Sequence, residues 1–157
     1  MPQDQGDRRP GGLLRFFLRM PVWLYRMRLG VLLGHRFLLL THIGRKSGLA
    51  RQAVLEVVRR DEPNNCCIIF SGWGEQSDWF RNIQKNPAVK VNMAGHQFRA
   101  TAVRLSLEEA QQELLDYARR NPVAFRRLAA WRLQEIPKEQ AETCRLLSQL
   151  LPAVLLY

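Results

Sequence analysis

The chain has few cysteines, and their spacing excludes two kinds of protein. Cys66 and Cys67 are adjacent and Cys144 lies far away, so no C-x-x-C pair and no Cys/His spacing suited to zinc occurs. Three cysteines in 157 residues are also too few for a disulfide framework. We therefore expect buried apolar thiols, no metal and a reducing compartment, which favours a cytoplasmic location.

The chain also lacks a hydrophobic run that could span a bilayer. Its most apolar stretch, residues 13–29, contains four arginines and Pro21, and arginine is costly in lipid. No segment is typical of a cleaved signal peptide. We expect a flexible tail over residues 1–12 and a helix over residues 13–30, kinked or divided at Pro21.

The arginines of this predicted helix share one face. Arg15, Arg19 and Arg26 fall together at helical spacing. Two interpretations remain open. The helix either packs on the rest of the domain with its arginines in water, or lies on the inner, anionic face of a membrane with Trp23 and Tyr25 at the headgroups.

Several catalytic signatures are missing as well. The sequence has no G-x-x-x-x-G-K-[ST] loop, no G-x-G-x-x-G before a helix, no H-E-x-x-H and no nucleophile elbow. The sequence therefore shows no recognisable set of side chains for acid–base or metal catalysis. A cofactor that carries its own reactivity would explain this, because the protein would need only to bind and orient it.

Acidic residues are scarce in the first part of the chain. Residues 1–60 hold 12 Lys and Arg against 3 Asp and Glu, whereas residues 61–157 hold 12 against 11. Of the net charge of +10, +9 thus belongs to residues 1–60, which hold the N-terminal arm and one basic turn. This bias favours an acidic partner, which could be a phosphorylated ligand, an anionic lipid or a nucleic acid.

What is present predicts an α+β protein. The composition, 46% hydrophobic and 24% charged, is ordinary for a globular domain, and we expect one domain over residues 13–157. Alternation and turn signals predict strands at 36–43, 51–60, 66–71, 88–93 and 97–105. Capping residues and prolines predict helices at 78–85, 106–120, 122–133 and 137–151. We therefore expect a barrel of about six strands over 36–105, with helices over 106–151.

The most informative stretch is the turn Gly44–Arg51. Three cations and a hydroxyl follow a predicted strand, and the flanking glycines permit close approach of the backbone. Backbone N–H groups in such a turn can form an anion-binding concavity, to which Arg45, Lys46 and Arg51 add charge. The alternative is an ordinary hairpin turn whose cations are merely solvated.

A second unusual loop runs from Ser71 to Trp79. Gly72 and Gly74 bracket Trp73 and could let a flat ring lie against the backbone. Ser71 at the strand end could donate a hydrogen bond to that ring. We expect Trp79 to anchor the helix that it opens rather than to bind a ligand.

These two stretches resemble the signatures of a known family. Leu39–Arg51 and Ser71–Pro87 are similar to the two motifs of the deazaflavin (F420)-dependent nitroreductase family, a branch of the flavin/deazaflavin oxidoreductase split β-barrels. The resemblance covers roughly residues 20–105. It departs at Val54, where the family commonly has proline, and beyond Ser106, where a tyrosine cluster is absent.

The resemblance implies a split β-barrel that binds coenzyme F420, a deazaflavin with a phosphate and an oligoglutamate tail. By position, the phosphate and tail would be held by Arg45, Lys46, Ser47 and Arg51. The ring would be lined by Gln52, Ala53, Val54, Phe70, Ser71 and Gly72, and the site closed by Ser77, Asp78, Trp79, Phe80 and Arg81. Ser71 is the candidate catalytic residue, and a homodimer is implied as well.

The resulting hypothesis is an oxidoreductase that passes hydride from reduced F420 to an electron-poor acceptor such as a quinone, nitroaromatic or enone. Two alternatives stay open. One is the same barrel with FMN or haem, and the other is a non-enzymatic binder of anionic membranes or nucleic acid. Nucleic acid is the less favoured partner, since aromatic residues are not interleaved with the cations in the strands and no recognition helix is evident.

Overall fold

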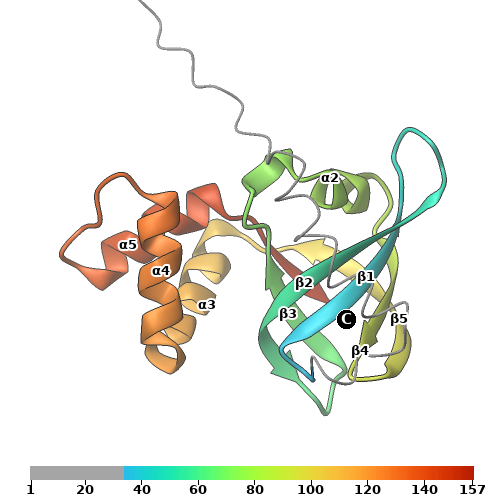
Figure 1. Cartoon of the computed structure of the whole chain (residues 1–157), viewed down its shortest axis with the longest axis horizontal. Helices are drawn as coiled ribbons and strands as arrows, with labels where there is room; N and C mark the ends of the chain where they lie inside the picture. Colours follow the sequence, from blue (N-terminus) through green and yellow to red (C-terminus); the bar gives the residue numbers. More distant parts are fainter. Residues whose placement is uncertain (1–33) are drawn as a thin grey trace, which may run out of the picture.

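The computed structural model describes residues 34–157, so the predicted tail and the helix over 13–30 lie outside the described residues. The described part is a barrel with a layer of helices beside it (Figure 1). In chain order the elements are β1 (Phe37–Ile43), β2 (Ala50–Asp61), β3 (Cys66–Phe70), the short 3-10 helix η2 (Gly74–Gln76), α2 (Asp78–Lys85), β4 (Ala88–Met93), β5 (His96–Arg104), α3 (Leu107–Arg120), α4 (Pro122–Arg132), α5 (Gln140–Leu150) and β6 (Ala153–Leu156).

The strands close into one antiparallel ring in the order β1-β2-β3-β6-β5-β4. This ring confirms the predicted α+β class and barrel. It also corrects the sequence analysis, which continued the helices to residue 151 and placed no strand after them. Residues 153–156 form β6, which pairs with both β3 and β5. Pro152 ends the helical stretch, and the four apolar residues after it are too few to show a period.

The start of α5 is a second correction. Pro137 was expected to open this helix, but α5 begins at Gln140. Glu139 is extended and serves as the N-cap, and the hydroxyl of Thr143 donates to the carbonyl oxygens of Glu139 and Pro137. The other predicted cap is confirmed, since Ser106 and Glu109 form a reciprocal capping box at the start of α3.

Alternating side chains fill the barrel. Leu38 and Leu40 of β1 point inward with Cys67 and Ile69 of β3, and all four are buried. The inward residues of β4 and β6 complete this core: Val89, Val91, Met93, Val154 and Leu156. Helix α2 covers one end of the barrel, because Phe80 and Ile83 insert into the same core.

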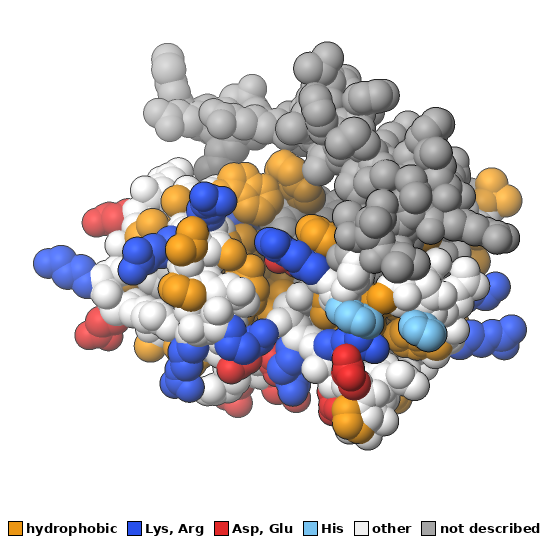
Figure 2. All heavy atoms as spheres, turned by 60° about the horizontal axis from the view of Figure 1, so that its bottom comes forward, with side chains coloured by type: hydrophobic (Ala, Val, Ile, Leu, Met, Phe, Trp, Pro, Cys, Tyr) orange, Lys and Arg blue, Asp and Glu red, His pale blue; other side chains and the backbone are white. Residues whose placement is uncertain are grey.

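A second apolar cluster joins the helices to the barrel. It is built from α3, α4 and α5, and Val58 and Phe70 of the barrel pack against it. Val57 faces the barrel core and Val58 faces the helices, because neighbouring residues of a strand point to opposite sides. The pairing of β2 with β3 shifts register between Val57 and Arg59. Hydrophobic side chains gather where the helices meet the barrel (Figure 2).

The cysteines lie as expected. All three are free thiols, and Cys67 and Cys144 are buried, whereas Cys66 on the opposite face of β3 is partly exposed. Burial raises the pKa of the Cys67 thiol to about 12, so this sulfur stays protonated and packs as an apolar group.

Candidate functional site

The turn between β1 and β2 is held closed by its own backbone. Gly44 N donates to Leu49 O at 2.8 Å, and Gly48, at φ +68°, donates to Gly44 O at 2.9 Å. The Ser47 hydroxyl accepts from Leu49 N and folds over Gly44, where a Cβ would lie only 2.6 Å from its oxygen. Glycine at position 44 therefore makes room for the serine side chain.

Arg45 fixes this turn to helix α2. Its guanidinium binds the Asp78 carboxylate at 2.9 Å and the Asn82 side-chain oxygen at 3.0 Å. Its backbone N–H donates to the same Asn82 oxygen at 3.0 Å. The charge of Arg45 is thus balanced by Asp78, and the residue acts as a strut between the turn and the helix.

Asn82 continues this network into the barrel. Its amide nitrogen lies 3.1 Å from Nδ1 of His42 and donates to it, which leaves the ring proton on Nε2. Both side chains are buried. Burial lowers the pKa of His42, and the nearby Arg51 guanidinium lowers it further. The neutral imidazole of His42 therefore accepts a hydrogen bond from Asn82 and helps to hold the side chain that contacts Arg45.

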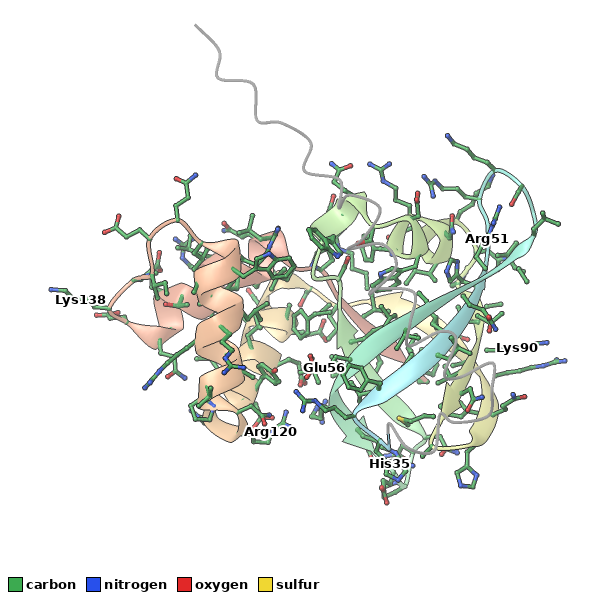
Figure 3. All side chains as sticks on the ribbon, in the orientation of Figure 1. His35, Arg51, Glu56, Lys90, Arg120 and Lys138 are labelled. Atoms are coloured by element: carbon green, nitrogen blue, oxygen red, sulfur yellow. The ribbon has the colours of Figure 1, made fainter. Side chains whose placement is uncertain are left out.

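Three further cations surround the strut. Lys46 and Arg51 are exposed, and Arg51 lies opposite His42 in the β1–β2 register. Lys85 at the end of α2 donates from Nζ to the Arg45 carbonyl at 3.0 Å. We call Arg45, Lys46, Arg51 and Lys85 the cationic corner; Figure 3 shows Arg51 at the hairpin end of the barrel, beside α2.

The corner has donors to spare. Within residues 34–157, Lys46 and Arg51 make no ion pair, and the backbone N–H groups of Lys46 and Ser47 have no hydrogen-bond acceptor. Four predicted residues therefore meet here as expected: Arg45, Lys46, Ser47 and Arg51. Together they offer a surface for an anion with several oxygens.

The loop after β3 is tightly organised. The buried Ser71 hydroxyl donates to Gly74 O at 2.6 Å and lies 2.7 Å from the Ser77 hydroxyl. Gly74, at φ +73°, packs so closely that a Cβ would lie 2.9 Å from Leu150 O of α5. In this arrangement the proton of Ser71 is used inside the loop, so the residue shapes the loop rather than presenting a donor to a ligand.

A tryptophan side chain covers Gly72, one of the two glycines against which a flat ring was expected to lie. Ring atoms of Trp131, from α4, lie 3.4 and 3.5 Å from the position of a Cβ on Gly72. Trp131 meets Trp73 edge to face, with ring centroids 5.0 Å apart. The two indoles are 50% and 45% exposed, so the aromatic surface at this loop is offered by tryptophans instead of the bare backbone.

Other predicted site residues point elsewhere. Ala53 pairs with Leu40 and faces the inside of the barrel, while its neighbours Gln52 and Val54 face outward. Phe70 packs on the helices, and Phe80 is 2% exposed in the barrel core. The side chains of Ala53, Phe70 and Phe80 therefore point away from the candidate site and do not line it.

The helix-anchoring role of Trp79 is confirmed. Its indole packs partly buried against the barrel core and contacts Phe80 edge to face. Arg81 binds the Glu75 carbonyl and the Gln76 side chain, so it links η2 to α2 at the edge of the loop.

Sequence reasoning missed the roles of His42, Asn82 and Lys85. A signal was available, because Asp78, Asn82 and Lys85 are spaced by four and three residues and so share one face of the predicted helix. The partner of that face, Arg45, lies 37 residues from Asn82, and only the fold brings them together.

Two features are absent from the part of the chain that the structure describes. From residue 34 onward, no helix has the length and apolar character needed to cross a membrane. Within the same residues no three His, Cys, Asp or Glu side chains come together as a metal site. The cytoplasmic or membrane-peripheral location stays a prediction.

The described residues form a closed six-stranded barrel with a cationic turn and an aromatic loop at one end, and this is the fold of the split β-barrel proteins. More narrowly, residues 17–138 match the model of the F420H(2)-dependent quinone reductase family, and the chain belongs to that family. It is therefore an oxidoreductase whose coenzyme is F420.

Solved structures share the fold at low identity. An F420-H2 dependent reductase (FDR-A) is 20% identical, with 79% of this chain and 96% of that chain covered and a TM-score of 0.54. A putative pyridoxamine 5'-phosphate oxidase from Listeria innocua is 12% identical (85% and 92% covered, TM-score 0.51). The structure of a domain-swapped dimer is 18% identical (87% and 99% covered, TM-score 0.52). A search of curated proteins gives no match.

Proposed function

We propose that this protein transfers hydride from reduced F420 to an electron-poor acceptor of the quinone class, and that the cationic corner holds the phosphate of the coenzyme. The observation that carries the proposal is the pairing of Arg45 with Asp78 and Asn82. This pairing fixes the turn while leaving Lys46 and Arg51 unpaired among the described residues.

The donors present fit the coenzyme chemically. A phosphate is recognised by backbone N–H groups together with Lys and Arg side chains, and the corner supplies both kinds of donor. Asp78 is the carboxylate that contacts the corner, and Arg45 neutralises it. An anion therefore meets little repulsion there.

The second part of the proposal concerns the ring and the acceptor. When bound, the reduced coenzyme supplies a hydride, which together with one proton converts a quinone to a hydroquinone. The half-exposed Trp73 and Trp131 lie beside the loop that leads into α2 and offer flat, apolar faces to ring and acceptor. Ser71 and Ser77 hold that loop in shape. Nitroaromatics and enones are further candidate acceptors, because they too have an electron-poor atom that can take a hydride.

The test is a fluorescence titration of the protein with F420, comparing the wild type with Lys46→Gln/Arg51→Gln. We expect micromolar or tighter binding by the wild type and a loss of about tenfold or more in the double variant, the size expected when two charged contacts are removed. Lys138→Gln is the matched control, since Lys138 is exposed and lies on the helical side (Figure 3).

Three results would contradict the proposal. They are no binding of F420 by the wild type, equal binding by the double variant, or preferential binding of FMN or haem in a parallel titration. Quinone reduction is then followed from the oxidation of the coenzyme. Light scattering tests whether the protein forms a homodimer, which stays a prediction. One of the solved structures with this fold is a domain-swapped dimer.

A further inference from the structure

An arginine beside the two half-exposed tryptophans has unused hydrogen-bond donors. Arg132 ends helix α4 directly after Trp131, and its guanidinium carbon lies 5.3 Å from the centre of the Trp131 ring. Within residues 34–157 this side chain makes no hydrogen bond and no ion pair, and its Nε is buried without an acceptor. Contact with the indole therefore places the guanidinium while its N–H groups remain free.

The same arginine reaches the loop that leads into α2. Its Nη2 lies 3.9 Å from the position that a Cβ would take on Gly74, two residues beyond the glycine that Trp131 covers. Trp73 lies between these glycines in sequence and meets Trp131 edge to face. Two indoles and one guanidinium thus share a short stretch of surface, and we call Trp73, Trp131 and Arg132 the aromatic–arginine cluster.

No carboxylate of the described residues neutralises this cluster. Glu75, the acidic residue of η2, is paired with Arg104 of β5. Glu135, three positions after Arg132, is exposed and makes no salt bridge with it. A cation with a buried N–H and no acceptor is unfavourable in the free protein. The cluster is therefore suited to a flat ligand that brings an oxygen with it.

The reaction proposed above creates such an oxygen. When a hydride adds to a quinone, its two electrons pass to the acceptor and a negative charge develops on an acceptor oxygen. A proton from water then completes the hydroquinone, while the coenzyme is left oxidised. A fixed donor aimed at the oxygen where charge develops lowers the barrier to hydride transfer. An arginine can do this without gaining or losing a proton, because it acts only as a donor.

We propose that Arg132 is a catalytic residue that donates hydrogen bonds to the acceptor oxygen, while Trp73 and Trp131 pack against the acceptor ring. The inference rests on the proposed function and deepens it. It names the chemical group by which the protein recognises its acceptor, an oxygen at the edge of a flat ring, and the side chain that recognises it.

The first test is a binding measurement that needs no turnover. The protein, alone and saturated with oxidised F420, is titrated by calorimetry with 2-naphthoate and with 2-naphthamide, which are flat rings of the same size bearing an anionic and a neutral oxygen group. We expect the wild type to bind naphthoate about tenfold more tightly than naphthamide, as for one hydrogen bond between charged groups. Arg132→Gln should bind the two probes equally. Arg132→Lys should keep part of the preference, because it retains the charge and loses the planar fork.

Arg127→Gln is the matched control. Arg127 is an exposed arginine of the same helix and makes no ion pair within residues 34–157, so its loss should leave the preference for naphthoate unchanged. Urea denaturation of Arg132→Gln should give the wild-type midpoint, since no contact with a protein acceptor is lost.

The second test is kinetic. With 1,4-naphthoquinone as acceptor, Arg132→Gln should lower kcat by about tenfold to a hundredfold, the direction expected when a donor to a developing oxyanion is removed. Its affinity for F420 should equal that of the wild type, because the cationic corner is untouched. Arg127→Gln should change neither quantity.

The possible failures are distinguishable. Equal binding of the two naphthyl probes by the wild type, or a wild-type preference in Arg132→Gln, would overturn the assignment of Arg132 while leaving the proposed function standing. An unchanged kcat or a weakened affinity for F420 in Arg132→Gln would overturn it as well. A wild type that prefers naphthoate through Arg132 and yet does not bind F420 would refute the proposed function, and with it the catalytic role.

Discussion

Replacing Asn82 by alanine should weaken both the fold and the cationic corner. The side chain is 4% exposed and makes three hydrogen bonds, two from Arg45 and one to His42. Its removal leaves Nδ1 of His42 buried without a donor, whereas water can reach the half-buried Arg45. A buried hydrogen-bonding atom left without a partner costs about 1–3 kcal/mol. With the lost contacts to Arg45 added, we expect the free energy of unfolding to fall by about 2–3 kcal/mol.

The assay is urea denaturation, followed by a coenzyme titration under native conditions. Gln84→Ala is the control, because Gln84 is exposed on the same helix and should change stability by less than about 0.5 kcal/mol. Coenzyme affinity should fall in Asn82→Ala and not in the control. If the two variants are equally stable, the strut does not carry the energy assigned to it, and the argument for a fixed turn fails.

Three further outcomes are expected. The pKa of His42 in the folded state lies below its ordinary value of 6.5, so the unfolded chain binds the proton more tightly. The free energy of unfolding should therefore fall as the pH drops below about 6.5. Denaturation at several pH values should show a flatter pH dependence for His42→Gln than for the wild type. Gly74→Ala combines a positive φ with a clash against Leu150 O, whereas Gly48→Ala meets open space at a similar φ. Gly48→Ala should lower the free energy of unfolding by about 1–2 kcal/mol and Gly74→Ala by clearly more. Equal melting temperatures of the two variants would contradict this. Ser106→Ala should remove the capping box and cost about 1 kcal/mol in thermal unfolding, with a loss of helical signal from α3.

Local signals in the sequence were enough to find most elements. The strand boundaries at residues 88–93 and the helix at 78–85 match the structure, because alternation, Asn86-Pro87 and an acidic first turn are short-range features. β6 was missed because a strand of four apolar residues has no readable period. Its identity depends on β3 and β5, which lie far away in the sequence.

The candidate site was predictable only in part. The basic turn was found from composition and glycine placement, yet the neutralisation of Arg45 by Asp78 depends on how α2 folds back over the barrel. Trp131 over Gly72 likewise comes from α4, 59 positions further along the chain. The sequence shows which groups are present, whereas contacts of this range decide which of them remain open to a ligand.

The position of β6 between β3 and β5 has a consequence for biosynthesis. During translation, β1 to β5 leave the ribosome well before residues 153–156, so the ring has a gap of one strand while α3, α4 and α5 are being made. The open edges of β3 and β5 then expose unpaired backbone groups that could recruit other strands. Closure of the cylinder is thus a late event in vectorial synthesis, and the nascent protein depends on those four residues to seal it.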